Sequence, residues 1–293
     1  YYKMTENIKN AILFYTPNSK YFAQLIVDKT GCKMGEIIHN TYGNGEKYYR
    51  INIENRTSLA GKEIIFVSSM ESDQELLEIF RVGCELASLG TKKRIFVIPY
   101  LGYSTMERAV KAGEIVSAKA NARMLSAIPN NGLGNYFLFC DLHASGILQY
   151  FEGNCSCFEL YAEKSLIEKI KIVISKIENS NFVFGSADLG RPLWVETFAK
   201  HFNCPIALIR KVRNFENTQV LGDPIGNVKG KYVLIYDDMT RSAGTLIKAA
   251  KAYISSGAIK CFAILSHLAL INEEIIDLLT NCSEIEYIIC TNS

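Results

Sequence analysis

Paired carboxylates followed by small and hydroxylic residues form the stretch of this chain best suited to chemistry. Asp237 and Asp238 come directly after an apolar run, residues 232–236, that is too short for a helix and rich in β-branched and aromatic residues. Small and hydroxylic residues follow, and then apolar residues recur at helical spacing, beginning with Leu246 and Ile247. The pattern predicts a buried strand, a loop that contains a site, and a helix.

A loop of this kind at the start of a helix is suited to an anion, most simply a phosphate. The first turn of a helix leaves backbone N–H groups without partners in the helix, and the helix dipole favours negative charge. Gly244 lets the backbone approach a ligand closely, while Ser242 and Thr245 add hydroxyl donors. The carboxylates would repel a phosphate, so they should face sugar hydroxyls or a divalent cation. An ordinary turn with a solvated aspartate pair is the alternative, which the extra small and hydroxylic residues disfavour.

A pair of cations follows another predicted strand, residues 206–209. Lys211 and Arg213 are one residue apart, so they can face the same side of an extended chain. Such a pair can neutralise phosphate charge, although cations at a sheet edge also discourage aggregation or are simply solvated.

Polar side chains also follow two more predicted strands. Residues 137–140 end in Asp141 and His143, at the carboxyl end of a strand, where open α/β sheets bind ligands. A neutral imidazole is a good ligand or acid–base group, but a single histidine there is more often structural. Asp188 follows the predicted strand 181–185, where it is either a ligand-binding carboxylate or the N-cap of the next helix.

Strands alternate with helices along the whole chain, which predicts doubly wound α/β domains with mainly parallel sheets. Further strands are predicted at 11–15, 49–53, 64–67, 94–99, 260–267 and 285–290. Helices are predicted at 19–29, 73–89, 163–176 and 273–279, and around Trp194 and Phe198. The composition turns to Gly, Asn and Cys within residues 151–158, and 293 residues suffice for two domains. We therefore expect domains at 1–152 and 153–293.

Composition excludes several classes of protein. The apolar fraction of 48% and charged fraction of 21% allow a normal core, and a formal net charge of +2 argues against a dedicated nucleic-acid binder. No apolar run approaches the roughly 18 residues of a membrane span, and no leader peptide is evident. Nine scattered cysteines, an odd number, favour free thiols in a reducing compartment, so we expect a cytoplasmic protein. The chain starts at Tyr1 without Met and stops at Ser293 after a strand-like run, which suggests truncation at either end.

Several segments resemble one enzyme family. Asp237 to Thr245 resembles the ribose-phosphate-binding signature that type I phosphoribosyltransferases share with ribose-phosphate diphosphokinases, also called phosphoribosyl-diphosphate synthetases. Three further segments resemble the diphosphokinases alone: the run after Pro99 that ends in Ala-Arg-Met-Leu125, the segment Asp141-Leu-His-Ala144, and Lys211-x-Arg213. The loop Thr105-Met-Glu-Arg108 replaces the Arg-Gln-Asp of the commonest branch and is similar to the plant-type branch.

The resemblance implies two phosphoribosyltransferase-like domains, the first a degenerate copy on the ATP side and the second binding ribose 5-phosphate. ATP and ribose 5-phosphate would give 5-phosphoribosyl 1-diphosphate and AMP. The ribose 5-phosphate site would comprise Asp237, Asp238, Arg241, Ser242, Ala243, Gly244 and Thr245. ATP would contact Asn44, Glu46, Arg108 and His143, with Asn44 and Glu46 reaching a neighbouring subunit of a homo-oligomer. Mg²⁺ would lie near His143 and Asp188, and Lys211 and Arg213 would be the catalytic pair.

Departures from the family pattern keep two alternatives open. Ala187 stands where the family usually has proline, Arg241 where the commonest branch has aspartate, and the nucleotide loop is altered. A non-catalytic paralogue that regulates an active synthetase is one alternative. A type I phosphoribosyltransferase is the other, but it does not account for His143, for the cation pair or for the length of the chain.

Overall fold

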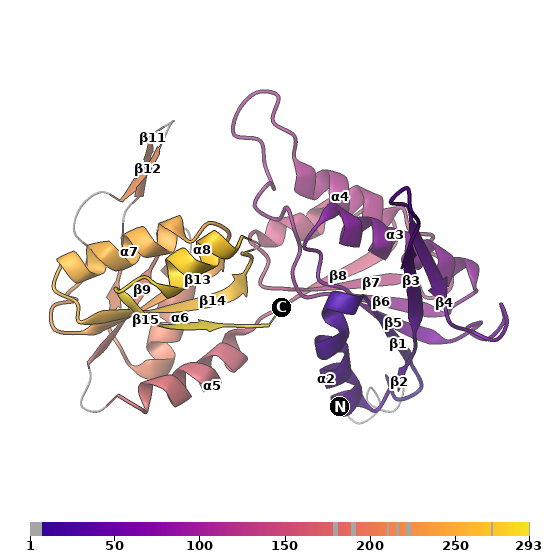
Figure 1. The fold of residues 1–293 in the computed structure, drawn as a ribbon, viewed down its shortest axis with the longest axis horizontal. Helices are drawn as coiled ribbons and strands as arrows, with labels where there is room; N and C mark the ends of the chain where they lie inside the picture. The colour runs from indigo at the N-terminus through magenta and orange to yellow at the C-terminus, as the bar shows by residue number, and fades with distance from the viewer. Residues whose placement is uncertain are drawn as a thin grey trace. The chain divides into compact units, whose positions relative to one another are not determined.

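Two α/β units make up the computed structural model, one ending at Leu160 and the other running from Tyr161 (Figure 1). The structure describes residues 8–177, 181–188, 192–209, 211–214, 217–220, 224–270 and 272–292. The boundary lies beyond residue 152, where the composition had placed it, because Cys155–Leu160 is a strand, β8, that pairs with the first sheet. This strand was missed in the sequence because glycine, asparagine and cysteine around it were interpreted as a linker.

The first unit is built on a six-stranded sheet in the order β2-β1-β5-β6-β7-β8, and every pair in it is parallel. Its remaining strands are β1 (Ile12–Tyr15), β2 (Lys33–Met34), β5 (Glu63–Val67), β6 (Lys93–Ile98) and β7 (Asn135–Cys140). The helices are α2 (Lys20–Thr30), α3 (Asp73–Ser88) and α4 (Ser117–Ser126), with short 3₁₀ turns η1 (Pro17–Ser19) and η2 (Ser145–Tyr150). Strands β3 (Ile37–Thr41) and β4 (Lys47–Ile51) form a separate antiparallel hairpin.

Helices cover both faces of this sheet, as a doubly wound fold requires. Helices α3 and α4 pack over the buried rings of Phe96 and Phe137, while α2 packs over Leu13 and Val67 on the other face. The alternation arises because successive strand residues point to opposite faces.

The second unit repeats this plan with five parallel strands in the order β10-β9-β13-β14-β15. The strands are β9 (Phe182–Ser186), β10 (Ile206–Ala207), β13 (Tyr232–Thr240), β14 (Lys260–Leu268) and β15 (Ile285–Cys290). The helices are α5 (Glu163–Ile174), α6 (Pro192–Phe202), α7 (Gly244–Ser255) and α8 (Glu273–Thr280), and β11 (Lys211–Asn214) pairs with β12 (Asn217–Val220) as a hairpin. On one face Phe198 of α6 packs against Tyr236, with ring centroids 4.7 Å apart, and on the other α7 covers Val233 and Ile235.

The order of elements is the same in both units. In each, a strand, a helix and an edge strand are followed by a hairpin, and then by a strand at the centre of the sheet and a helix. By this order β5 and α3 correspond to β13 and α7, and the β3–β4 hairpin corresponds to β11–β12. The parallel, doubly wound architecture predicted from the sequence is confirmed.

The predicted end of one strand was wrong. Strand β13 continues to Thr240, four residues past its predicted end, so the aspartate pair lies within the strand. In the part of the chain that the structure describes, no helix combines the length and apolar character needed to cross a membrane.

Candidate functional site

The two aspartates of β13 occupy different environments. Asp238 is 2% exposed, whereas Asp237 is partly buried and pairs with Leu265 of β14. The backbone N–H of Asp238 donates to Oδ1 of Asp237 at 3.1 Å. Successive side chains in a strand point to opposite faces, so the two carboxylates cannot serve one ligand in the same way. The sequence had suggested two equivalent carboxylates.

A tight turn joins β13 to α7. The backbone N–H of Ala243 donates to Oγ1 of Thr240 at 3.1 Å, which closes the turn. Ala243 has φ = 55° and is fully buried, while Arg241 and Ser242 are exposed. A left-handed conformation costs a non-glycine residue about 1–2 kcal/mol, and here burial in the core holds it in place. The turn therefore fixes the direction in which the N-terminus of α7 opens.

The first turn of α7 has the features of an anion site. It contains no acidic residue, and its N-cap, Ala243, provides no side-chain hydrogen bond. A Cβ built on Gly244 would have only Oγ of Ser242 within 4 Å, at 3.8 Å, so space is open at that position. Gly244 and Thr245 are both partly buried. Helical N–H groups, the helix dipole and adjacent hydroxyls together favour a phosphate there.

Strand β9 brings Asp188 beside this turn. Ser186 pairs with Tyr236, so Ala187 and Asp188 follow on the same edge of the sheet as Asp237. Asp188 is partly buried. The carboxyl ends of parallel strands meet at one edge, where open α/β sheets bind their ligands.

Tyr253, which the sequence suggested only as a core residue, fixes this edge. Its hydroxyl accepts from the N–H of Ser186 at 3.1 Å and lies 3.0 Å from the carbonyl oxygens of Ser186 and Ala207, to which it donates. Burial raises the pKa of the Tyr253 phenol, so it stays neutral. A Cβ on Gly185 would lie 2.8 Å from this hydroxyl, which explains a glycine inside a strand.

The predicted catalytic cations lie on the β11–β12 hairpin. Lys211 and Arg213 pair with Val220 and Thr218, so they occupy alternate positions of one strand. Leu208 and Ile225, which lie before and after the hairpin in the chain, are joined by reciprocal backbone hydrogen bonds of 2.9 Å.

In the first unit, the end of β7 presents Asp141 and His143. Asp141 is 3% exposed with φ = 43°, and its N–H donates to the carbonyl oxygen of Leu160 at 2.9 Å. The N–H of Leu142 donates to Oε1 of Glu159 at 3.0 Å. His143 is partly buried. The missed strand β8 therefore supplies both groups that fix this loop.

The other predicted nucleotide contacts are exposed. Arg108 pairs with Glu107, Nε to Oε1, at 3.4 Å, and its side chain is 79% exposed. Asn44 and Glu46 lie at the tip of the β3–β4 hairpin, where Oδ1 of Asn44 accepts from the N–H of Glu46 at 3.2 Å. A small-molecule contact from these side chains would need no rearrangement of buried groups.

Backbone strain is concentrated at these segments. Four non-glycine residues in the described part of the chain have positive φ: Tyr103, Asp141, Asn203 and Ala243. Three of the four lie in segments picked out from the sequence. Such strain persists where surrounding structure enforces it, and it clusters at functional sites.

The described residues contain no group of three or more His, Cys, Asp or Glu side chains that could hold a metal ion by themselves. His143 and Asp188, the predicted metal residues, belong to different units, each of which the structure describes by itself. Asp188 and Asp237 are accessible carboxylates, and Mg²⁺ usually takes one or two carboxylates together with phosphates and water. The donor set therefore fits Mg²⁺ that arrives bound to phosphates.

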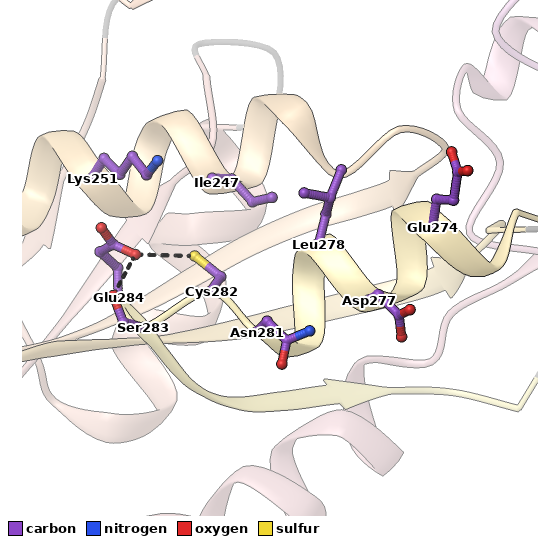
Figure 2. Close-up of a pocket in the computed structure, with 9 residues that line it drawn as sticks. All are labelled: Ile247, Lys251, Glu274, Asp277, Leu278, Asn281, Cys282, Ser283 and Glu284. Carbon is purple, nitrogen blue, oxygen red and sulfur yellow. Dashed lines mark hydrogen bonds between the residues drawn. The ribbon is translucent and has the colours of Figure 1, made fainter.

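A separate hollow of about 700 Å³ lies between α7, α8 and the turn before β15 (Figure 2). Ile247 and Leu278 supply apolar surface, while Glu274, Asp277 and Glu284 supply carboxylates. Carboxylates repel polyphosphates, and none of the predicted site residues lines this hollow. It is distinct from the candidate site.

Comparisons with known proteins agree with this division into two units. Residues 11–128 match the model of the N-terminal domain of ribose phosphate pyrophosphokinase, and residues 159–285 match that of the phosphoribosyl transferase domain. The crystal structure of phosphoribosylpyrophosphate synthetase from Mycobacterium smegmatis is similar with a TM-score of 0.81 and 20% identity, over 97% of this chain and 95% of that one. This similarity shows the fold of the whole chain.

Single phosphoribosyltransferases are similar over less of the chain. The purine phosphoribosyltransferase from Pyrococcus horikoshii has 15% identity and a TM-score of 0.32, over 45% of this chain and 81% of that one. These values are too low to bear on the fold. The two matched domains and their order are therefore what the comparisons show: the chain contains a domain of the kind found at the N-terminus of ribose phosphate pyrophosphokinase, followed by a phosphoribosyl transferase domain.

Proposed function

We propose that this protein is a ribose-phosphate diphosphokinase, which transfers the diphosphoryl group of ATP to the 1-hydroxyl of ribose 5-phosphate and releases AMP. The observation that carries the proposal is the start of α7, a helix N-terminus without an acidic residue, which follows the partly buried Asp237 and the buried Asp238 in a chain with both matched domains. A type I phosphoribosyltransferase would not need the N-terminal domain.

The acceptor sugar would bind at the end of β13. Asp237 is the more accessible carboxylate and would accept hydrogen bonds from the ring hydroxyls, while buried Asp238 supports the turn. The 5-phosphate would lie over the residues that start α7, from Arg241 to Thr245. Arg241 is exposed, and a cation beside a phosphate is favourable.

Transfer of the diphosphoryl group places negative charge on oxygens around the β-phosphorus, so the main tasks are positioning and neutralisation. Lys211 would supply a compact charge and Arg213 a planar fork of donors, from alternate positions of the same strand. Mg²⁺, held by phosphates, water and the carboxylate of Asp188, would neutralise phosphate charge when bound.

The nucleotide would contact His143, Arg108, Asn44 and Glu46. Contact from Asn44 and Glu46 of a neighbouring subunit makes a homo-oligomer part of the proposal. The resemblance of Thr105–Arg108 to the plant-type branch supports the further proposal that the chain is closest to that branch, for which we expect weak dependence on inorganic phosphate.

Incubation of the purified protein with MgCl₂, ATP and ribose 5-phosphate tests the proposal. Equal amounts of AMP and 5-phosphoribosyl 1-diphosphate are expected, with no AMP when either ribose 5-phosphate or magnesium is omitted. If no AMP forms at any concentration of inorganic phosphate, the chain is not a synthetase on its own. Activity that appears only when an active synthetase is added would support the regulatory paralogue instead.

A further inference from the structure

A partly open hollow of about 130 Å³ lies in the first unit between the β3–β4 hairpin, the segment after β1 and the first turns of α3. One wall is an ion pair that joins the hairpin to the helix. Nε2 of His39, on β3, lies 2.7 Å from Oε1 of Glu78, on α3. The Glu78 side chain is only 4% exposed, and the His39 side chain is 26% exposed.

The hydrogen bonds of His39 require the pair to hold a proton. Nδ1 lies 2.9 Å from the carbonyl oxygen of Ile37, which can only accept, so Nδ1 carries a hydrogen. Nε2 then either donates to the Glu78 carboxylate or accepts from the protonated acid. In both forms the pair has one proton more than a neutral imidazole with a carboxylate. Without it, a nitrogen lone pair would face a buried carboxylate oxygen at 2.7 Å.

Few other charged groups surround this pair. Glu75 on α3 lies close enough to disfavour the Glu78 carboxylate, and Lys47 on β4 donates to Thr41 at the rim of the same hollow. Arg81 of α3 lies beside Tyr49, whose ring packs edge-on against His39 with centroids 5.5 Å apart. Burial raises the pKa of Glu78, which His39 only partly offsets.

We infer that the His39–Glu78 pair is a positioning device that holds the β3–β4 hairpin onto α3 while it retains its shared proton, and thereby positions the hairpin tip that contains Asn44 and Glu46. That the tip then contacts a nucleotide phosphate rests on the proposed function. The link between the hairpin and the helix does not depend on the proposed function. Residues 37–51 form one antiparallel ladder of five register pairs, three of which run from His39 to the tip, so a shift at His39 moves the whole hairpin.

Hydrogen–deuterium exchange of the full-length protein tests the link directly. Replacing Glu78 by Leu removes the acceptor, and amides of residues 37–51 should exchange roughly tenfold faster, because a charge-assisted hydrogen bond that resists local opening is lost. Helix α7 should be unchanged. Exchange in the hairpin equal to that of the wild type would overturn the inference.

Glu78→Gln is the matched variant, because it keeps a hydrogen bond to His39 but removes the titrating carboxyl. In the wild type we expect hairpin exchange, after correction for intrinsic rates, to increase as rising pH removes the shared proton, and in Glu78→Gln this increase should disappear. A merely structural role would leave the two pH profiles parallel, which would contradict the inference. If Glu78→Leu does not fold, the comparison of pH profiles between the wild type and Glu78→Gln tests the inference by itself.

Kinetics separate the inference from the proposed function. In Glu78→Leu, KM for ATP should rise about tenfold, while KM for ribose 5-phosphate stays within twofold. An unchanged KM for ATP with a loosened hairpin would overturn the positioning role. A wild type that makes no AMP, but whose hairpin exchange responds as expected, would refute the proposed function and leave the link standing.

Discussion

Helices α3 and α7 begin at corresponding places in the two units, yet their N-termini differ in chemistry. Ser72 caps α3, accepting from the N–H of Gln74 at 3.2 Å, and Asp73 and Glu75 lie in its first turn. Helix α7 has a left-handed alanine as its N-cap, no side-chain cap and no acid in its first turn. Negative charge and a cap stabilise the start of α3, whereas the start of α7 has neither and is the more favourable of the two for a bound anion.

The loops that precede these helices differ in the same way. After β5, the N–H of Met70 donates to the carbonyl oxygen of Tyr100 and its own carbonyl accepts from Gly102, both at 2.9 Å. Met70 is fully buried, and a Cβ on Gly102 would collide with the Met70 carbonyl. After β13, by contrast, Gly244 has open space. The first unit fills this place with its own chain, whereas the second leaves space open at the corresponding turn.

The largest expected effect is on turnover, when Lys211 of the β11–β12 hairpin is replaced. Changing Lys211 to Ala should lower kcat at least about 10³-fold, as expected for loss of a cation that neutralises a transferring phosphoryl group, while ribose 5-phosphate binding stays unchanged. Steady-state kinetics and calorimetric titration measure the two. Lys33→Ala, at an exposed lysine of β2, is the control. Equal loss of binding and turnover would show that the role of Lys211 is misassigned.

An acid introduced at the start of α7 should make it resemble α3. Thr245→Asp should weaken ribose 5-phosphate binding by roughly 100-fold through charge repulsion. The free energy of unfolding should change by less than about 1 kcal/mol, because a carboxylate is favourable at a helix N-terminus. Titration calorimetry measures the expected loss of binding, and thermal melts measure the expected small change in stability. Binding that survives the substitution would place the phosphate elsewhere.

Replacing Gly102 and Gly244 by alanine compares the filled turn of the first unit with the open turn of the second. Gly102→Ala should destabilise the protein by about 1–3 kcal/mol, because the new methyl group collides with the backbone of Met70. Gly244→Ala should leave stability equal or slightly higher, since its Cβ meets only Ser242, and should weaken sugar-phosphate binding several-fold. Denaturant unfolding and ligand titration of both variants test the contrast, which equal stability losses would contradict.

The smallest effect is expected at the cap of α3. Ser72→Ala removes the acceptor for the N–H of Gln74 and should cost about 1 kcal/mol of stability. KM for ribose 5-phosphate should stay the same, because the proposed sugar-phosphate site lies at the start of α7 and not at this helix. Thermal melting and kinetics at saturating ATP check both values. A change in KM for ribose 5-phosphate would mean that the two helix starts are not independent.

Much of this contrast was predictable from the sequence, because hydrophobic periodicity and turn residues are local signals. The strand–loop–helix unit around Asp237 and the parallel sheets were predicted correctly. The left-handed Ala243 was not, since alanine carries none of the local signal that glycine would. Strand β8 was missed because its pairing with β7 is a long-range property, and the anchoring of β9 by Tyr253 is long-range for the same reason.

The site itself was only partly predictable. Residue types suggested a phosphate at Ser242–Thr245, but the different burial of Asp237 and Asp238 depends on how far β13 continues, which propensity does not determine. The pairing of His39 with Glu78 joins residues 39 positions apart, and no motif indicates it.

Titration calorimetry of the full-length protein with ribose 5-phosphate tests most directly the claim that one unit binds the sugar phosphate and the other does not. We expect one molecule bound per chain, with an affinity that falls roughly 100-fold in Thr245→Asp and is unaffected by Ser72→Ala. Two molecules per chain, or one whose binding survives Thr245→Asp and is lost with Ser72→Ala, would contradict this claim.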